Sequence, residues 1–349
     1  AADGLRDTSR GLVGSEMCIR DRGGLADGGI QVVIGTHALF QHDVLFERLG
    51  LVIVDEQHRF GVHQRLALRE KGASGRVPHQ LVMTATPIPR TLAMTAYADL
   101  DLSVIDELPP GRTPVSTVVV TESRRDQVVE RVALACGEGR QAYWVCTLIE
   151  ESEALQCQAA EETALLLTEA LQGLRIGLVH GRLKGPDKEA VMAAFKAGEI
   201  DLLVATTVIE VGVDVPNASL MVIENAERLG LSQLHQLRGR VGRGARQSHC
   251  VLMYRPPLGE VARERLAVMR ATNDGFEIAR RDLAIRGPGE VLGTRQTGEM
   301  QFRIADLLRD QELVPQVQAL AERLLASHPD CVAPLIRRWV GDRVQYADV

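Results

Sequence analysis

Short, unbroken runs of apolar residues constrain the fold of this chain more than any other feature. Several runs end in a small, hydroxyl or acidic residue, and amphipathic segments separate the runs. Apolar runs of this kind are typical of parallel strands buried on both faces by helices. The sequence therefore predicts an α/β fold, with strands expected at 31–35, 51–54, 80–84, 141–149, 175–180, 201–206 and 219–223.

Changes in composition divide the chain into segments. A Pro/Gly cluster at 108–114 separates two series of apolar runs and is typical of an interdomain linker. After Pro257 the pattern changes to charged helical segments. Helices are expected at 150–171, 188–196, 259–273, 276–285 and from 304 onward. We expect a first domain at 23–107, a second at 108–256 and a small helical region at 257–349.

The segment 1–22 has no helical or strand period and is rich in Gly and charge. We expect it to lie outside the fold, either as a mobile linker or as extraneous sequence resembling translated adaptor. The first residue is not Met, which leads us to expect an internal piece of a longer protein.

Composition excludes several classes of protein. Of the 349 residues, 45% are hydrophobic and 25% charged, as in globular proteins, and no apolar run is long enough to span a bilayer. Without a secretory signal pattern, we expect a cytoplasmic protein with no membrane partner. The six cysteines form no C-x-x-C pair, which argues against a zinc site or disulfide scaffold. A net charge of −6 argues mildly against a simple electrostatic nucleic-acid binder, but not against local basic clusters.

Two adjacent carboxylates, Asp55 and Glu56, follow the apolar run at 51–54. Ligands of open parallel sheets bind at the carboxyl ends of the strands. One carboxylate there can hold Mg²⁺ on nucleotide phosphates, and its neighbour can orient or deprotonate water. An ordinary strand end explains the pair equally well.

Further groups of residues are candidates for functional contacts. Gln236 to Gly244 alternates Arg with Gly, which suits close approach to phosphates and stabilisation of their charge; a solvated basic turn is the alternative. Thr84 and Thr86 follow another apolar run, where they could equally cap a helix. Gly35-Thr36 and Thr206-Thr207 also end apolar runs and suit hydrogen bonds to a phosphodiester backbone, or ordinary turns.

In chain order, these segments resemble the motif series of superfamily 2 helicases. The matching segments are 34–37 (motif Ib), 55–58 (II), 84–86 (III), 204–214 (V) and 236–243 (VI). Within this superfamily, DEQHRFG from Asp55 and TATPIPRTL from Thr84 narrow the match. The stretch 276–298 resembles a motif shared by the RecG and Mfd families. Gln57, the DELPPGRTPV run and the segment 301–309 favour RecG over Mfd.

The resemblance implies two RecA-like domains, the first one truncated, with ATP and Mg²⁺ between them. Asp55 would hold Mg²⁺, Glu56 would activate water, and Arg240 and Arg243 would reach the γ-phosphate. Further nucleotide-binding positions would be Gln57, His58, Gly212, Asp214 and Gln236. Positions for nucleic-acid binding or coupling would be Gly35, Thr36, Thr84, Thr86, Thr206, Thr207, Arg281, Arg286 and Gln296.

The same resemblance implies a monomeric, ATP-driven translocase that remodels branched double-stranded DNA, with single-stranded DNA-binding protein as a further partner. Two features depart from the family pattern. No G-x-x-x-x-G-K-[ST] phosphate-binding loop occurs, so we expect the chain alone to be inactive, and Arg280 stands where Glu is expected. An Mfd-like translocase and a non-catalytic DNA-binding module are the alternatives.

Overall fold

The computed structural model describes residues 19–35, 37–56, 71, 77–84, 101, 103–107, 112–147, 153–207, 215–244, 246–286 and 310–339. The chain separates into two compact units. One comprises Ala1–Ala85 with Gln318–Val349, and the other comprises Thr86–Val317.

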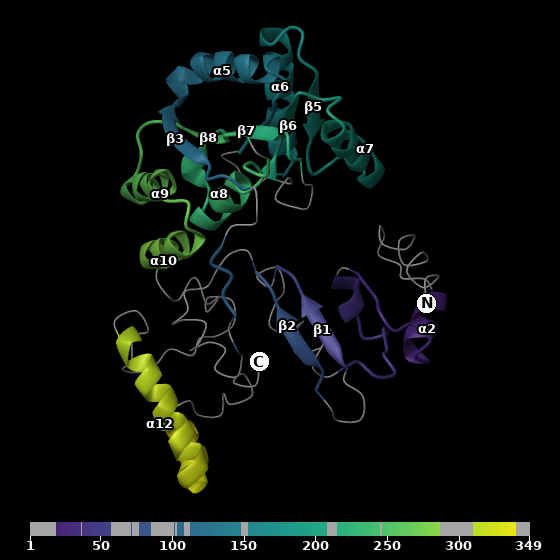
Figure 1. The fold of residues 1–349 in the computed structure, drawn as a ribbon, viewed down its shortest axis with the longest axis vertical. Coiled ribbons are helices and arrows are strands. Elements are labelled where there is room, and N and C mark those ends of the chain that lie inside the picture. Colours follow the sequence, from purple (N-terminus) through teal and green to yellow (C-terminus); the bar gives the residue numbers. More distant parts are fainter. Residues whose placement is uncertain are drawn as a thin grey trace. The chain divides into compact units, whose positions relative to one another are not determined.

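The second unit is built on a six-stranded sheet in which all neighbouring strands pair in parallel (Figure 1). The strand order is β3-β8-β7-β4-β6-β5, so β4 and β7 lie in the interior of the sheet. The strands are β3 (Ser116–Thr121), β4 (Gln141–Val145), β5 (Ile176–Val179), β6 (Leu202–Ala205), β7 (Ala218–Ile223) and β8 (His249–Tyr254). Every residue of β4, β6 and β7 is buried, which explains their mainly apolar sequences.

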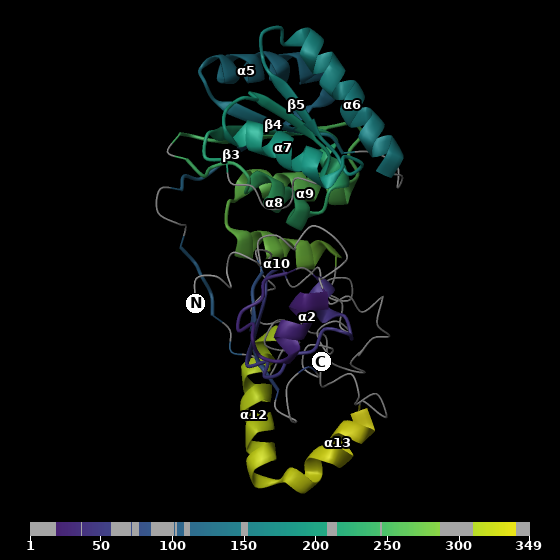
Figure 2. The ribbon, with the colours of Figure 1, turned by 90° about the vertical axis from the view of Figure 1, so that its right-hand side faces the viewer.

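Helices cover both faces of this sheet (Figure 2). On one face, α5 (Arg125–Gly137) and α6 (Glu153–Ala170) pack around the buried Trp144. On the other face, α7 (Gly185–Lys196) and α8 (Leu231–Arg238) pack around Tyr143. Two further helices, α9 (Glu260–Ala271) and α10 (Gly275–Arg286), extend the core on the α8 side through Leu266, Met269 and Ile278. The predicted α/β architecture of parallel, RecA-like type is confirmed.

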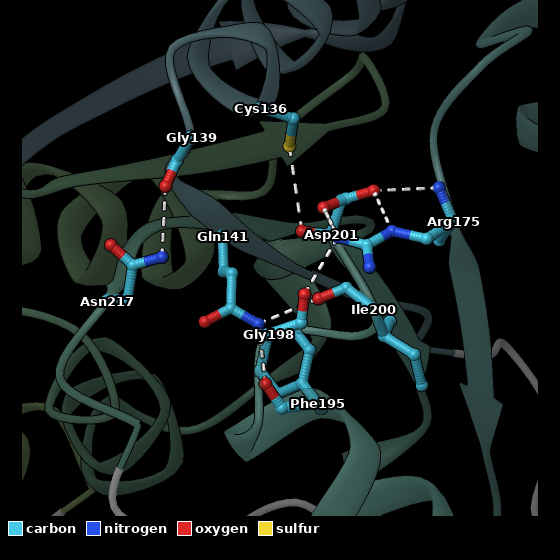
Figure 3. Close-up of polar contacts among 9 residues, drawn as sticks. All are labelled: Cys136, Gly139, Gln141, Arg175, Phe195, Gly198, Ile200, Asp201 and Asn217. Atoms are coloured by element: carbon cyan, nitrogen blue, oxygen red, sulfur yellow. Dashed lines mark hydrogen bonds and ion pairs between the residues drawn. The ribbon is translucent and has the colours of Figure 1, made fainter.

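A polar network holds together the amino ends of the strands (Figure 3). The buried Gln141 side chain donates from Nε2 to the carbonyls of Phe195 (2.5 Å) and Ile200 (2.7 Å). Arg175 donates to both carboxylate oxygens of Asp201, at 3.0 and 2.6 Å. These hydrogen bonds from Arg175 lower the pKa of the Asp201 carboxyl. The network satisfies main-chain groups at an edge of the sheet opposite to the one where ligands bind.

The first unit has a two-stranded parallel sheet, β1 (Leu51–Val54) and β2 (His79–Val82), among its described residues. It also contains α2 (Ile19–Ala26) and the short 3-10 helix η2 (His37–Phe40). Because α2 begins at Ile19, the last four residues of the predicted non-folded segment are helical, whereas residues 1–18 lie outside the described part. Arg22 on α2 forms an ion pair with Asp43.

The strand predicted at 31–35 is wrong, because these residues have no regular structure. A strand needs a neighbour to accept and donate its main-chain hydrogen bonds. Among the described residues, β1 and β2 pair only with each other. Val32 and Ile34 are instead exposed, at 69% and 64% of their surface.

Helices α12 (Val314–Ser327) and α13 (Val332–Trp339) form the described part of the C-terminal region, as expected. The short 3-10 turns η8 (Gln311–Leu313) and η9 (Pro329–Cys331) precede them. Within the ranges given above, no helix combines the length and apolar character that crossing a membrane requires. The predicted domain boundaries at 107/108 and 256/257 stay predictions.

The cysteines in the described part of the chain are free thiols. Burial raises the pKa of Cys136 to about 11 and those of Cys146 and Cys250 to about 12. Inside the described ranges, no group of three or more His, Cys, Asp or Glu side chains could hold a metal ion.

Candidate functional site

The carboxyl ends of β1 and β2 bring the predicted motif II and motif III residues to one edge of the sheet. Val54 is paired with Val82, and the Met83 amide donates to the Val54 carbonyl at 2.8 Å. Asp55 and Glu56 follow β1, and Thr84 lies two residues beyond the end of β2. Parallel pairing thus places a carboxylate pair and a hydroxyl at neighbouring strand ends.

The turn at Asp55 and Glu56 has an unusual backbone. Glu56 has φ of 54°, in the left-handed region that non-glycine residues rarely adopt. Its amide donates to Asp55 Oδ1 at 2.9 Å, which stabilises the turn. Asp55 is exposed and Glu56 is half-buried. Strained conformations of this kind cost about 1–3 kcal/mol and cluster at functional sites.

The donor set at this turn suits Mg²⁺. Mg²⁺ in nucleotide enzymes is commonly bound by one or two carboxylates together with substrate phosphates, with waters completing the shell. Asp55 supplies an exposed carboxylate at the ligand-binding edge of the sheet. A cluster of protein ligands is not required for such a site.

Lys71 stabilises the segment that follows Gly35. Its ammonium donates to three carbonyls, those of Leu39 (3.3 Å), Gln41 (2.5 Å) and Val44 (2.8 Å). Burial lowers the pKa of Lys71 from its ordinary value. The exposed Gly35 lies four residues before the first of these carbonyls, and the role of the predicted motif Ib residues stays a prediction.

In the second unit, the predicted motif VI arginines lie on a loop, Gly239–Gly244, which we call the arginine loop. It follows α8 directly, and both Arg240 and Arg243 are half-buried. A buried Val241 anchors it in the core, and the Gly242 amide donates to Ser248 Oγ at 3.1 Å. Gln236, one turn earlier, lies on α8 and is also half-buried.

The main chain just after the predicted motif V segment contacts the arginine loop. A Cβ atom at Gly244 would lie 2.4 Å from the Pro216 carbonyl oxygen, so no other residue fits there without movement of the backbone. The two segments are 28 positions apart in the sequence (216 and 244). The fold therefore places Pro216, two residues beyond the predicted motif V segment, against the last residue of the arginine loop.

Arg238 belongs to the same motif but has a different environment. It is 3% exposed, and its Nη1 lies 2.8 Å from the carbonyl oxygens of Met269 and Thr272, at the end of α9. Its Nη2 lies 3.2 Å from Nδ1 of His235. Burial lowers the pKa of His235 to about 4, and the Arg238 and Arg112 guanidiniums act in the same direction. This burial distinguishes Arg238 from the half-buried Arg240 and Arg243, the arginines predicted to reach the γ-phosphate.

The strand ends of the second unit contain further predicted positions. Thr206 follows β6 but is only 2% exposed, whereas Thr207 is half-buried and accessible. On α10, Arg281 is exposed and its Nε donates to Glu277 at 3.1 Å. Arg280, the departure from the family pattern, forms an ion pair with the same carboxylate. Its position is therefore compatible with the helix.

Several predicted residues lie outside the described residues, so their placement stays a prediction. They are Thr36, Gln57, His58, Thr86, Gly212, Asp214 and Gln296, together with the side chain of Arg286. The predicted convergence of Asp55 and Glu56 with Arg240 and Arg243 also stays a prediction, because these pairs belong to different units.

Three protein-family models match the chain. They describe a DEAD/DEAH box helicase (residues 9–95), a helicase conserved C-terminal domain (residues 124–245) and the C-terminal part of domain 3 of the ATP-dependent DNA helicase RecG (residues 272–338). The last model covers α10, α12 and most of α13.

Individual proteins give the same result. The chain is 65% identical to the ATP-dependent DNA helicases RecG of Pasteurella multocida and Escherichia coli K12, over 92% and 93% of its length. It spans about half the length of these relatives, 47% in each case. A solved structure of RecG bound to a three-way DNA junction is 47% identical, with a TM-score of 0.61 over 84% of this chain and 37% of that one. The chain belongs to the RecG helicase family and corresponds to the C-terminal portion of its members.

Proposed function

We propose that this chain forms the C-terminal part of an ATP-driven translocase that moves along double-stranded DNA and remodels branched DNA. The observation that carries the proposal is the turn at Asp55 and Glu56: a carboxylate pair in a strained backbone conformation, at the edge of a parallel sheet where nucleotides bind. A relative bound to a three-way DNA junction supports the choice of substrate.

The proposed roles follow from position and chemistry. The exposed Asp55 carboxylate holds Mg²⁺, which neutralises charge on the nucleotide phosphates. The half-buried Glu56 carboxylate accepts a proton from the attacking water or orients it. Arg240 and Arg243 offer guanidinium donors to the charge that develops on the γ-phosphate. Arg281 and Thr207 are accessible groups that suit contact with DNA phosphates or coupling to them.

The test uses an extended protein in which this chain is joined to the upstream half of a RecG relative. Replacing Glu56 with Gln keeps the size of the side chain but removes the base. We expect DNA-stimulated ATP turnover to fall by about 10²–10⁴-fold, with nucleotide binding retained. Glu47→Gln, at a partly exposed carboxylate in the same unit, is the matched control and should leave turnover unchanged. Equal turnover in the Glu56→Gln variant and the parent would refute the role of Glu56.

The chain by itself has a second candidate function, as a DNA-binding module without ATPase activity. The observation that favours it is the missing G-x-x-x-x-G-K-[ST] motif. We expect no Mg²⁺-dependent ATP turnover from the isolated chain, and DNA binding that weakens steeply with salt. We further propose that the full-length protein is a cytoplasmic monomer and acts together with single-stranded DNA-binding protein. The relatives named above are RecG proteins, so we do not retain the Mfd-like alternative.

A further inference from the structure

A short segment just before β3 lies along the arginine loop. Arg112 donates from Nη2 to the Gly239 carbonyl at 2.8 Å, across 127 positions of sequence. A Cβ atom at Gly242 would lie 2.8 Å from Val115 Cγ2 and 3.2 Å from the Thr113 carbonyl oxygen. The segment Arg112–Val115 therefore contacts the loop at both Gly239 and Gly242.

The Gly239 carbonyl is a favourable acceptor for a guanidinium. Gly239 is the C-terminal cap of α8, and the last carbonyls of a helix bear partial negative charge without partners in the helix. Arg243 Nε donates to the same oxygen at 3.2 Å. One carbonyl thus binds Arg112 and one of the two predicted arginines of motif VI. Its peptide plane also includes the Arg240 amide, so fixing the carbonyl fixes the start of the loop.

The absence of a side chain at Gly242 lets the arginine loop approach Val115 closely. Its φ of 81° is in the left-handed region, where a side chain is disfavoured, and Val115 fills the space that a side chain would need. Val115 is itself 7% exposed and belongs to the core of the unit. The loop can therefore shift only if the segment Arg112–Val115 shifts with it.

We propose that Arg112 is a positioning residue for Arg240 and Arg243. By binding the Gly239 carbonyl, it sets the loop conformation in which these two guanidiniums are presented to a phosphate. The inference rests on the proposed function for the catalytic role of the arginines, but the mechanical support of the loop does not. Arg112 lies in the linker that the sequence predicts at 108–114. Its hydrogen bond to Gly239 therefore connects this linker to the loop whose arginines are proposed to contact the nucleotide.

The first experiment uses the chain as it exists and measures amide hydrogen exchange. Three loop amides are reporters: Arg240 donates to the Leu237 carbonyl, Val241 to the Arg238 carbonyl, and Gly242 to Ser248 Oγ. In Arg112→Ala we expect exchange across the arginine loop to accelerate about 10-fold or more, with β4 and β7 unchanged. Arg124→Ala is the matched control, since Arg124 is exposed and donates to Gln127 at 2.9 Å. Unchanged loop exchange, or equal acceleration throughout the unit, would overturn the support.

The second experiment measures DNA-stimulated ATP turnover in the extended protein. Arg112→Ala should lower kcat at least 10-fold while KM for ATP changes less than 3-fold, because the loop arginines act on the transition state. Arg112→Lys retains a cationic donor and should recover part of kcat. Loop exchange that accelerates while kcat is unchanged would overturn the positioning role. If Glu56→Gln also leaves turnover intact, the proposed function itself has failed, and exchange still decides whether Arg112 supports the loop.

Discussion

Replacing the buried Arg238 with Met should destabilise the second unit strongly. Met preserves most of the length and volume of the side chain but has no donor. The carbonyls of Met269 and Thr272, each 2.8 Å from Nη1, then lose a charged partner in a place that water reaches poorly. Arg238 also joins α8 to the end of α9, so its loss loosens the attachment of two helices.

The magnitude follows from these contacts. Hydrogen bonds to a charged group contribute about 1.5–3 kcal/mol each. Removing the guanidinium also removes the desolvation that lowers its pKa, and this gain offsets part of the loss. We expect the free energy of unfolding to fall by about 3 kcal/mol. With a slope near 2 kcal/mol/M in urea, the midpoint should move down by about 1.5 M.

The assay is equilibrium unfolding in urea, followed by tryptophan fluorescence. The chain has two tryptophans, and Trp144 is fully buried in the core of the second unit. A Trp339→Phe background makes Trp144 the reporter. Arg238→Lys is the graded control: one ammonium can replace only part of the contacts of the guanidinium, so the midpoint should lie between those of parent and Met variant. A Met variant as stable as the parent would show that the buried charge contributes no net stability, and the reasoning would be wrong.

Two further predictions concern the same unit. The pKa of His235 is about 4 in the fold and about 6.5 in the unfolded chain. Between these pH values only the unfolded state binds the proton, so acid favours unfolding. The free energy of unfolding should therefore fall by roughly 2 kcal/mol between pH 7 and pH 5. His235→Gln should flatten this part of the pH profile in urea unfolding, and an unchanged slope would contradict the assignment. Gln141→Met should lower stability by about 2 kcal/mol, because two carbonyls lose their donor. Asn217→Ala removes one exposed hydrogen bond to Gly139 at 3.0 Å and should lower the free energy of unfolding by less than half as much as Gln141→Met. Equal losses of stability in the two variants would argue against a special role of the buried Gln141 network.

The sequence predicts β4, β5, β6 and β7 of the second sheet but not the neighbouring strands β3 and β8. The strands β4, β6 and β7 are buried throughout, and apart from Gln141 and Ser219 they are apolar runs that can be recognised without a structure. We missed β3, which is an edge strand with half-exposed residues and three hydroxyl side chains. Its neighbour β8 begins with a polar His249 and was also missed. Their pairing depends on tertiary contacts and not on a local pattern.

Residues 31–35 show the opposite error. An apolar run ending in Gly has the composition of a strand, but composition carries no information about whether a neighbouring strand is available. Here the described residues provide none, and Val32 and Ile34 stay exposed. The segment illustrates that a strand is a property of a pair of segments.

For the candidate site, the sequence located motifs but not the contacts that support them. Asp55, Glu56, Arg240 and Arg243 could be selected because their spacing matches a known motif series. Arg112 and Arg238 could not, because their acceptors are main-chain carbonyls up to 127 positions away. A carbonyl is present at every residue, so no side-chain pattern marks it. The only signals were an Arg inside the Pro/Gly cluster and an Arg at the end of the amphipathic helix α8.

These contacts also explain how a chain with net charge −6 can depend so heavily on arginine. Arg112, Arg238 and Arg243 donate to backbone carbonyls, whose partial charges do not enter the net charge. The planar guanidinium has five donors, so Arg238 can bind two carbonyls and a histidine at once. Lysine has a more compact charge and cannot span the same set. These three arginines therefore support the loop and helices internally, and the net charge is a poor guide to such contacts.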